Sequence, residues 1–291
     1  MKPIDLGSKA IAITGASAGI GLATARACAR AGMAVAIGAR RLDRLEEIAR
    51  EIRSGGGRAV AIECDVSDEA SCRAFVSTSV EAFGSLHAVF ANAGYGVEVP
   101  TLEMSDEAWE RMLRTNFWGT LWIVRAAVAQ MRTQTRPAQG LAGHVLVCSS
   151  CLSKIGAPYH AAYSASKACQ DHLSRALRHE LASDGIYVSS VHPVGTRTEF
   201  FDELERRSPA SLGLSSGNTS LQSPDRVAGA IVRCLRRPSG EVWTSTITRL
   251  ALGLGTAFPG LADRGVARYM RSHLRRAVGG QKDGHRSSHG S

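Results

Sequence analysis

The chain has 291 residues, 44% of them hydrophobic and 21% charged, which is typical of a globular protein and excludes collagen, coiled coil and wholesale disorder. Its formal net charge is +9, but residues 264–291 carry seven basic residues and one acidic residue, a net of +6 that leaves only +3 for the rest. A nucleic-acid-binding protein would usually spread its basic residues over a groove or stripe, so the sequence predicts no nucleic-acid partner.

Short apolar runs alternate with segments of helical composition along the chain. In chain order, we expect strands at 10–13, 34–37, 59–62, 86–91, 144–148 and 186–191, with a last strand at 241–244. We expect helices at 21–31, 42–52, 69–83, 106–131, 161–183 and 226–235. Because the strands are almost wholly apolar, this alternation predicts an α/β fold, a doubly wound parallel sheet with helices on both faces in three layers.

No change of composition marks a second domain, so we expect a single domain over residues 1–278 and a disordered tail over 279–291. Within the C-terminal part, about 200–278, the Ser/Gly-rich segment 201–221 predicts a mobile lid over the substrate. Residues 250–262 form an uncharged, largely apolar stretch that is too short to span a bilayer. Three interpretations of that stretch stay open: an interfacial segment in peripheral contact with a membrane, a cover over an apolar pocket, or a subunit contact.

The cysteine pattern and the N-terminus indicate a reducing compartment. The seven cysteines are odd in number and scattered, which does not indicate a disulfide framework. Cys148 and Cys151 have C-x-x-C spacing, but buried cysteines acting as small hydrophobes are the favoured interpretation. No signal peptide is apparent, so we expect a cytoplasmic protein. Since no His, Cys, Asp and Glu residues stand at metal-ligand spacing, we also expect no metal.

A glycine-rich loop joins the first strand to the first helix. Gly15 permits a tight turn, Gly19 lets the backbone approach a pyrophosphate, and Gly21 allows the helix to pack closely on the strand. Ser17 and Ile20 stand between these glycines. Because the helix N-terminus offers free N–H groups and a positive dipole end, the loop predicts nucleotide binding.

Two arginines follow the second strand, where an enzyme that binds a ribose 2′-hydroxyl would place an acid. Arg40 and Arg41 could instead pair with a 2′-phosphate. The sequence therefore predicts NADP(H) as the cofactor, with NAD(H) less favoured. The alternative is that the two arginines only begin a solvated helix.

Tyr163 and Lys167 stand one turn apart in a predicted helix and therefore share a face. A nearby ammonium is expected to lower the pKa of the phenol and make Tyr163 a general acid or base. Ser150 directly follows the fifth strand, at the edge of the sheet where open α/β folds bind their ligands.

Together these motifs resemble the short-chain dehydrogenase/reductase family. The resemblance covers about residues 9–200 and rests on motifs that occur in the family's order: the glycine loop, Asp65-Val66, Asn92-Ala93-Gly94, Asn116, Ser150, Tyr163-xxx-Lys167 and Pro193. It implies a Rossmann-type fold and homodimers or homotetramers. Two positions depart from the family pattern: Val194 stands where the family usually has Gly, and Ala18 where it often has a basic residue.

The resemblance also implies a role for each matched residue. Tyr163 transfers the proton, Lys167 lowers its pKa and binds the nicotinamide ribose, Ser150 orients the substrate oxygen, and Asn116 holds a water. The catalytic residues are therefore expected to be Asn116, Ser150, Tyr163 and Lys167, with Ser150 and Tyr163 also binding substrate. The cofactor-binding residues are expected to be Gly15, Ser17, Gly19, Ile20, Gly21, Arg40, Arg41, Asp65, Val66, Asn92, Ala93, Gly94, Tyr163, Lys167, Pro193, Thr196 and Thr198.

Residues beside the motifs have less certain roles. Tyr95, Cys151, His160 and Phe200 are as compatible with a pocket wall as with a structural role. His192 is expected to be a packed residue rather than a base, because Tyr163 already fills that role.

The sequence thus predicts an NADP(H)-dependent oxidoreductase that interconverts a ketone or aldehyde and an alcohol, and we take a lipophilic substrate as the hypothesis. One alternative is nucleic-acid binding through the basic tail, and the other is an NADP(H)-binding regulatory or scaffold protein with little turnover. The presence of all four catalytic-type residues argues against the second alternative.

Overall fold

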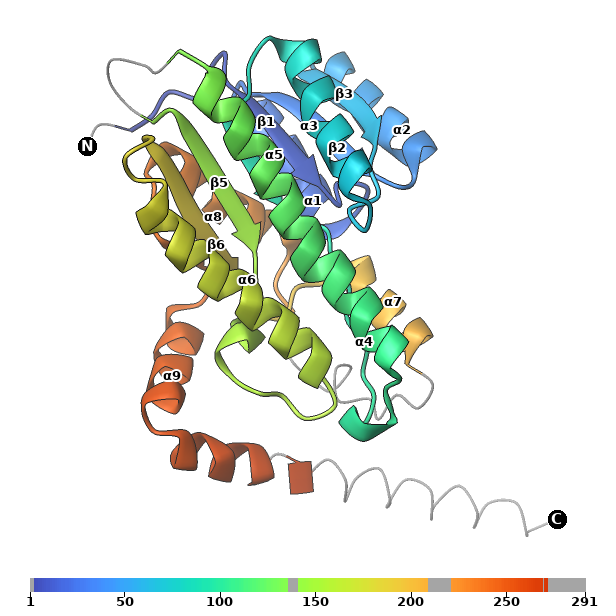
Figure 1. Cartoon of the computed structure of the whole chain (residues 1–291), viewed down its shortest axis with the longest axis vertical. Coiled ribbons are helices and arrows are strands. Elements are labelled where there is room, and N and C mark those ends of the chain that lie inside the picture. The colour runs from blue at the N-terminus through green and yellow to red at the C-terminus, as the bar shows by residue number, and fades with distance from the viewer. Residues whose placement is uncertain (1–2, 136–140, 209–220, 269, 272–291) are drawn as a thin grey trace, which may run out of the picture.

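The computed structural model describes residues 3–135, 141–208, 221–268 and 270–271. Within these residues, seven strands form one parallel sheet with the order β3-β2-β1-β4-β5-β6-β7 (Figure 1). The strands are β1 (Ala10–Thr14), β2 (Ala34–Ala39), β3 (Arg58–Glu63), β4 (Ala88–Ala91), β5 (Gly143–Cys148), β6 (Ile186–His192) and β7 (Glu241–Trp243). The order reverses between β1 and β4, so the chain leaves these neighbouring strands in opposite directions and opens a crevice at their carboxyl ends.

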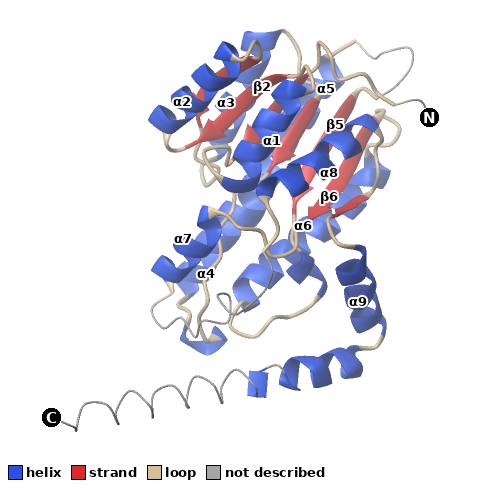
Figure 2. Ribbon diagram, turned by 180° about the vertical axis from the view of Figure 1, so that it is seen from behind, coloured by secondary structure: helices blue, strands red, loops and turns tan. Residues whose placement is uncertain are grey.

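Helices cover both faces of the sheet (Figures 1 and 2). They are α1 (Gly19–Arg30), α2 (Leu42–Ser54), α3 (Glu69–Phe83), α4 (Asp106–Leu113), α5 (Gly119–Thr133), α6 (Ala161–Glu180), α7 (Glu199–Arg207), α8 (Pro224–Arg236) and α9 (Thr246–Ala257). Side chains of α1, α2 and α8 share one buried core with the sheet, and side chains of α3, α5 and α6 share the other. The expected three-layered α/β fold is therefore confirmed.

Sequence-local signals explain where several elements begin. Every residue of β1, β2, β4 and β5 is buried, which accounts for the continuous apolar runs of a sheet covered on both faces. Asp68 caps α3 by accepting hydrogen bonds from the N–H groups of Ala70 and Ser71. Ser223 caps α8 by accepting a hydrogen bond from the Arg226 N–H. The helix begins with Pro224, which is tolerated in the first turn because the N–H that proline lacks would have no partner within the helix there.

The expected long helix at 106–131 is interrupted. It consists of α4, a π-helical turn at Arg114–Trp118 and α5. The turn leaves the carbonyl of Asn116 to side-chain donors, and Thr120 Oγ1 and Gln170 Nε2 donate to it at 2.8 and 2.6 Å. The helical composition of 106–131 gives no signal for such a turn, because one of the donors to the Asn116 carbonyl, Gln170, belongs to a distant helix, α6.

The C-terminal third contains more helix than expected. The segment 201–221 was expected to be a loop, but its beginning belongs to α7, while 209–220 lie outside the described residues. The apolar stretch 250–262 is helical apart from Phe258, and the helical part after it runs from 259 to 268. The expected disordered tail at 279–291 also lies outside the described residues.

Gly38 in β2 allows the large side chain of Phe75 from α3 to reach the sheet. A methyl group on Gly38 would lie 2.6 Å from the Phe75 ring, and that ring is fully buried. We expect Gly38→Ala to lower the free energy of unfolding by about 1–3 kcal/mol through overpacking.

Chemical denaturation of single and double variants checks this prediction. Phe75→Leu makes room for the new methyl group, so the Gly38→Ala, Phe75→Leu pair should be more stable than the sum of its single variants implies. Gly156 has open space around it, and Gly156→Ala is the matched control. Additive single effects would contradict the proposed contact.

Candidate functional site

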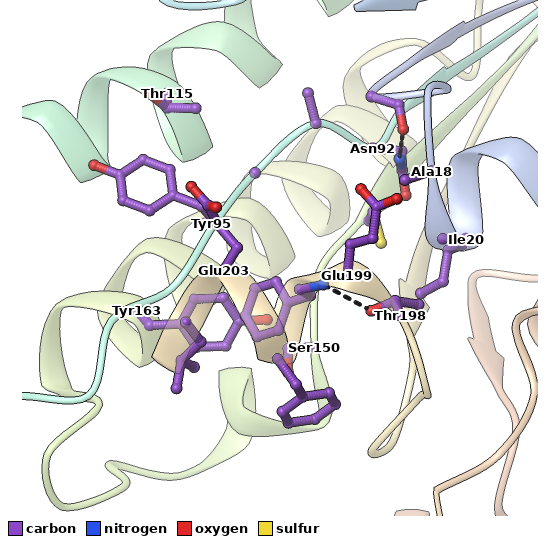
Figure 3. A pocket seen from close by; sticks show the side chains of 18 of the residues that line it. Ala18, Ile20, Asn92, Tyr95, Thr115, Ser150, Tyr163, Thr198, Glu199 and Glu203 are labelled. Atoms are coloured by element: carbon purple, nitrogen blue, oxygen red, sulfur yellow. Dashed lines mark hydrogen bonds between the residues drawn. The ribbon is translucent and has the colours of Figure 1, made fainter. Parts of the chain in front are cut away.

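A cavity of about 900 Å³ opens at the carboxyl ends of the strands. Its walls come from the β1–α1 loop, the residues that follow β2 to β6, the start of α6, and α7 (Figure 3). This volume is near the upper end of the range of about 300–1,000 Å³ for ligand pockets. Of the predicted site residues, the cavity is lined by Gly15, Ser17, Gly19, Ile20, Arg40, Arg41, Asp65, Val66, Asn92, Ala93, Gly94, Ser150, Tyr163, Lys167, Pro193, Thr196 and Thr198.

Gly21 and Asn116 lie behind this wall rather than on it. A methyl group on Gly21 would lie 2.3 Å from the carbonyl oxygen of Gly15, so only glycine lets α1 begin this close to the loop. Gly15 has a positive φ of 64°, and its Cβ would meet the Ala93 Cα at 2.9 Å. The glycine loop therefore packs backbone against backbone at the crevice between β1 and β4.

The N-terminus of α1 faces the cavity without a side-chain cap. Its N-cap is Ala18, which makes no capping hydrogen bond, and the first turn contains no acidic residue. Ala18, Gly19 and Ile20 all line the cavity. Backbone N–H groups and the positive end of the helix dipole are thus available to an anion, which fits the diphosphate of a dinucleotide.

Asn92 ties β4 to β1 beside this loop. Its side-chain Nδ2 donates to the Thr14 carbonyl oxygen at 2.9 Å, and its backbone N–H donates to Thr14 Oγ1 at 3.0 Å. The Ala93 N–H donates to the same hydroxyl at 3.2 Å. These bonds fix the two strand ends between which the crevice opens.

The ends of β2 and β3 bring a carboxylate and two arginines to one corner of the cavity. Asp65 Oδ1 accepts hydrogen bonds from the N–H and the hydroxyl of Ser67. Burial acts to raise the pKa of Asp65, but these bonds and the charge of Arg40 outweigh burial, so its pKa lies below the usual range. Asp65 is therefore an ionised acceptor in this corner.

Sequence reasoning missed Glu199, the first residue of α7. Its carboxylate lies 3.0 Å from Arg41 Nη2 and 2.7 Å from Arg44 Nη2. Arg41 Nη2 also donates to Ser17 Oγ at 3.0 Å. Arg41 and Glu199 are 158 positions apart in the chain, so no local pattern could have paired them. A carboxylate therefore does lie near the end of β2, but it belongs to Glu199 of α7 and not to the β2–α2 segment.

Ser150, Tyr163 and Lys167 all line the cavity, and Figure 3 shows Ser150 and Tyr163 side by side. The Lys167 side chain is buried, and its Nζ donates to the Cys148 carbonyl oxygen at 2.7 Å, at the end of β5. Nζ also lies 5.6 Å from the centre of the Tyr163 ring. The Ser150 hydroxyl accepts from the Leu152 N–H at 3.1 Å, which fixes its direction. The phenol, the Ser150 hydroxyl and the ammonium thus line the same cavity, and the ammonium lies against the Tyr163 ring.

The pKa of Tyr163 shifts in the opposite direction to the one that the sequence predicted. Burial, the largest influence, raises the pKa of the phenol, and hydrogen bonding to Ser150 offsets this only in part. Burial also lowers the pKa of Lys167. The expectation from helical spacing counted the attraction of the ammonium and ignored desolvation, which dominates in an enclosed site. Tyr163 is therefore held as a neutral phenol, ready to donate a proton.

Asn116 supports the site from behind. Its Oδ1 accepts from the Tyr95 N–H at 3.0 Å, and its Nδ2 donates to the Tyr95 carbonyl oxygen at 2.9 Å and to Ser166 Oγ at 3.0 Å. A methyl group on Gly94 would lie 3.0 Å from Asn116 Oδ1 and 3.4 Å from Lys167 Nζ. Gly94 therefore leaves the room that brings the amide and the ammonium close together.

Several residues with less certain roles also line the cavity. Tyr95, Cys151, His160 and Phe200 line the cavity, as does Val194, which departs from the family pattern. The Phe200 ring centre lies 5.5 Å from that of Tyr163. Arg207 of α7 stacks over the Tyr95 ring at 4.5 Å. Aromatic side chains thus enclose the phenol on the side of α7.

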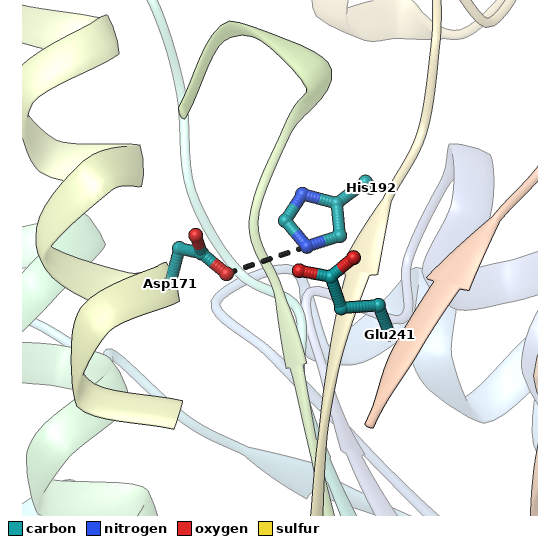
Figure 4. Close-up of side chains that lie close together, drawn as sticks. All are labelled: Asp171, His192 and Glu241. Carbon is teal, nitrogen blue, oxygen red and sulfur yellow. Dashed lines mark ion pairs between the residues drawn. The ribbon is translucent and has the colours of Figure 1, made fainter. Parts of the chain in front are cut away.

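A buried group of charges lies directly behind the Ser150 turn (Figure 4). His192 is fully buried and stacks on Trp243, and its Nδ1 lies 3.1 Å from the Ser150 carbonyl oxygen. Its Nε2 lies 3.4 Å from Asp171. The Lys154 ammonium lies 2.6 Å from Asp171 and 3.2 Å from Glu241. His192 is thus a packed residue, as expected.

Asp171, His192 and Glu241 could also be read as metal ligands, because one ligand atom from each lies within 4.8 Å of the others. The Lys154 ammonium, however, already bridges the two carboxylates. Burial acts to raise the pKa of Asp171, but hydrogen bonds from His192 and Lys154 outweigh it, so its pKa lies well below the usual range. The positive charge that balances the two carboxylates is therefore the Lys154 ammonium, in the place that a metal ion would take.

A family model described as short chain dehydrogenase matches residues 9–209. An uncharacterized oxidoreductase of Listeria monocytogenes is 30% identical, over 79% of this chain and 92% of its own length. An L-rhamnose 1-dehydrogenase (NAD(P)(+)) of Azotobacter vinelandii is 33% identical, over 77% of this chain and 88% of its own length.

The fold also matches solved structures. A short-chain dehydrogenase/reductase from Burkholderia phymatum, solved in complex with NAD, superposes with a TM-score of 0.80. The match covers 89% of this chain and 96% of the other at 23% sequence identity. At that identity the likeness concerns the fold alone.

Replacing Lys154 tests the buried charge group. We expect Lys154→Met to lower the free energy of unfolding by about 3 kcal/mol at neutral pH, because it leaves the buried Asp171 carboxylate without its cation. Since the folded-state pKa of Asp171 is depressed, the stabilisation is present above the ordinary Asp pKa of about 4 and is lost as the pH falls below it. The difference in the free energy of unfolding between the parent chain and Lys154→Met should therefore become smaller as the pH falls below about 4.

Urea denaturation at several pH values measures this difference. Arg132 pairs with Asp184 at the surface, so Arg132→Met is the matched control and should cost less than about 1 kcal/mol. Equal losses in the two variants, or a difference that does not change with pH, would show that Lys154 contributes only as a surface charge.

Proposed function

The chain belongs to the short-chain dehydrogenase/reductase family of oxidoreductases, and from this premise we propose that it interconverts a ketone or aldehyde and an alcohol with NADP(H). The observation that carries the proposal is the meeting of Ser150, Tyr163 and Lys167 in the cavity that the glycine loop also lines. Proton handling and dinucleotide binding would then occur side by side.

The residues present fit a dinucleotide. Gly15 and Gly19 present no side chains to the cavity where α1 begins, and the backbone N–H groups of this loop would hold the diphosphate. Lys167 would hold the ribose next to the nicotinamide. When bound, the nicotinamide supplies or accepts the hydride at the carbonyl carbon. The other predicted cofactor residues on the cavity wall would enclose the rest of the dinucleotide. Asn116 would position Lys167 and a water.

Tyr163 would donate the proton to the carbonyl oxygen during reduction. The phenol is held neutral by burial, and its hydrogen bond with Ser150 places both hydroxyls at the same point. Ser150 would orient the substrate oxygen. As the phenol loses its proton, the nearby Lys167 ammonium would stabilise the phenolate. The raised pKa of Tyr163 keeps the phenol in the protonated form that reduction requires.

Two arginines support NADP(H) rather than NAD(H). Arg40 and Arg41 line the cavity at the end of β2, where a 2′-phosphate would be bound. Arg41 is already paired with Glu199. A 2′-phosphate would therefore compete with the Glu199 carboxylate for Arg41, and this competition would weaken the preference for NADP(H). Arg40 would remain available to the phosphate and would maintain that preference.

The cavity wall near Tyr163 supports an apolar substrate. Phe200, Phe201 and Leu152 line the cavity on the side of α7 and the Ser150 turn, and Phe200 packs on the phenol. Large apolar side chains beside two hydroxyls suit a lipophilic ketone or alcohol better than a small charged one.

The first test is a spectrophotometric screen of ketones, aldehydes and alcohols with each coenzyme, followed by Tyr163→Phe. Removing the phenolic proton should lower kcat by about 10²–10⁴-fold and leave the Kd for NADPH within about twofold. Tyr187 in β6 lies at the other end of the sheet, so Tyr187→Phe is the matched control. Near-normal turnover in Tyr163→Phe would refute the proposed role.

The pH dependence should follow the direction of the Tyr163 pKa. Because that pKa lies above its ordinary value of about 10, kcat/KM for ketone reduction should stay level from about pH 6 to 9. Alcohol oxidation needs the deprotonated form and should rise with pH over the same range. A reductive rate that falls with a midpoint near neutrality would mean that the phenol titrates far below the expected range.

Coenzyme choice can be tested at the arginines. Charge-assisted hydrogen bonds contribute about 1.5–3 kcal/mol each, so Arg40→Ser with Arg41→Ser should weaken NADPH binding by at least about tenfold and leave NADH nearly unchanged. Glu199→Gln releases Arg41 and should tighten NADPH binding. Calorimetric Kd values for both coenzymes provide the measurement. An equal loss for NADPH and NADH would show that the arginines contact no 2′-phosphate.

A further inference from the structure

The α9 helix exposes an apolar face. None of its twelve residues is buried. Ile247, Leu250 and Leu254 on α9 are followed by Phe258 and Leu261, and each of the five is between 60 and 82% exposed. Ile247, Leu250 and Leu254 lie three and four residues apart and therefore share one side of α9. Phe258 stands at the break after α9, and Leu261 lies in the helical segment that follows. Large apolar side chains gathered in this way mark an interaction surface.

Arginines follow this apolar face at once. Between Ser245 and Arg271 the chain has four arginines (Arg249, Arg264, Arg268 and Arg271) and one acidic residue, Asp263. Arg264, Arg268 and Arg271 are exposed and lie three or four residues apart, so they share one side of the second helical segment. We call residues 245–271 the apolar–basic arm, and of these residues 269 is not described.

The apolar–basic arm cannot cross a membrane. No helix in the described part of the chain is long and apolar enough to do so. α9 has twelve residues, which at about 1.5 Å each is little more than half of the hydrocarbon thickness of about 30 Å. α9 by itself is therefore too short to span a bilayer.

We infer that the apolar–basic arm binds the surface of an anionic lipid bilayer. A helix with exposed Leu, Ile and Phe on one side and arginines nearby is typical of segments that lie in the plane of the interface. The five apolar side chains would enter the boundary between headgroups and acyl chains. The arginines would meet the negative headgroups, whose charge they complement.

The charge argues against a second copy of the chain as the occupant. A two-fold dimer through this arm would bring the same surface of both copies together, and each copy carries a net charge of +3 between 245 and 271. Like charges would then approach each other. A neutral lipid surface would leave the arginines without partners.

The position of the arm relates this surface to the cavity. α9 contacts the turn that follows Ser150, where Thr256 Oγ1 donates to the Lys154 carbonyl oxygen at 3.3 Å. Both views place the arm at the end of the molecule to which the strands point (Figures 1 and 2). A bilayer bound to the arm would therefore lie at the cavity end of the molecule. The inference concerns binding alone and does not depend on the proposed reaction.

Cosedimentation of the full chain with vesicles tests the inference. We expect binding to phosphatidylcholine vesicles that contain phosphatidylglycerol, at least about tenfold weaker binding to pure phosphatidylcholine, and weaker binding as salt rises. Leu250→Ser, Leu254→Ser and Phe258→Ser combined should reduce binding to the anionic vesicles by at least tenfold. Arg264→Gln, Arg268→Gln and Arg271→Gln combined should do the same and should also remove most of the salt dependence.

Matched controls separate the arm from general effects. Leu102 is 99% exposed on the 3₁₀ turn Thr101–Glu103, so Leu102→Ser removes an exposed leucine elsewhere. Arg50→Gln, Arg125→Gln and Arg175→Gln combined remove the same charge from exposed positions outside the arm. Both controls should bind as the parent chain does. Circular dichroism and thermal unfolding establish that the arm variants are folded.

Three outcomes would overturn the inference. The first is no binding to anionic vesicles, and the second is equal loss of binding in the arm variants and their controls. The third is sedimentation velocity without lipid in which the Leu250, Leu254 and Phe258 variant converts a dimer to a monomer, because the apolar face would then be occupied by a second copy. Since no readout is turnover, an inactive protein that binds vesicles would leave this inference standing and count only against the proposed function.

Discussion

The buried ammonium of Lys167 is the constraint on which the site depends. A cation enclosed by protein is unfavourable unless acceptors surround it, and Lys167 donates to the carbonyl at the end of β5. That bond joins α6 to the edge of the sheet and fixes the helix register that carries Tyr163. A methyl group on Gly94 would crowd Asn116 Oδ1 at 3.0 Å and would touch Lys167 Nζ at 3.4 Å, so glycine at this position leaves room for both polar groups.

A second group of buried charges stabilises the same turn from the other side. Lys154, Asp171 and Glu241 join the turn after Ser150 to α6 and β7, and His192 lies against the Ser150 carbonyl oxygen. Asp171 stands one helical turn after Lys167 in α6. Lys167 lines the cavity, whereas Asp171 is buried against Lys154 in the turn after Ser150. Ser150 is thus held between two polar groups whose partners come from distant parts of the chain.

The sequence contained enough to predict the sheet, the glycine loop and the meeting of Ser150, Tyr163 and Lys167, because apolar runs, backbone-only turns and helical spacing are local properties. Other features depend on distant contacts. The pairing of Arg41 with Glu199 joins positions 158 apart, and the Asn116 carbonyl freed by the π-helical turn accepts a hydrogen bond from Gln170, 54 positions away. The pKa direction of Tyr163 depends on enclosure by other segments, which no spacing reports. The helix α7 was missed because its residues were grouped with the Ser/Gly-rich segment that follows them in the sequence.

The ion pair between Arg41 and Glu199 couples two ends of the cavity. Glu199 is the first residue of α7, and the next residues of that helix, Phe200 and Phe201, form part of the cavity wall. An anion that engages Arg41 would take one of the two cationic partners of Glu199 and leave Arg44 as the other. The charge at the end of β2 is therefore linked, through the first residue of α7, to the aromatic wall beside Tyr163.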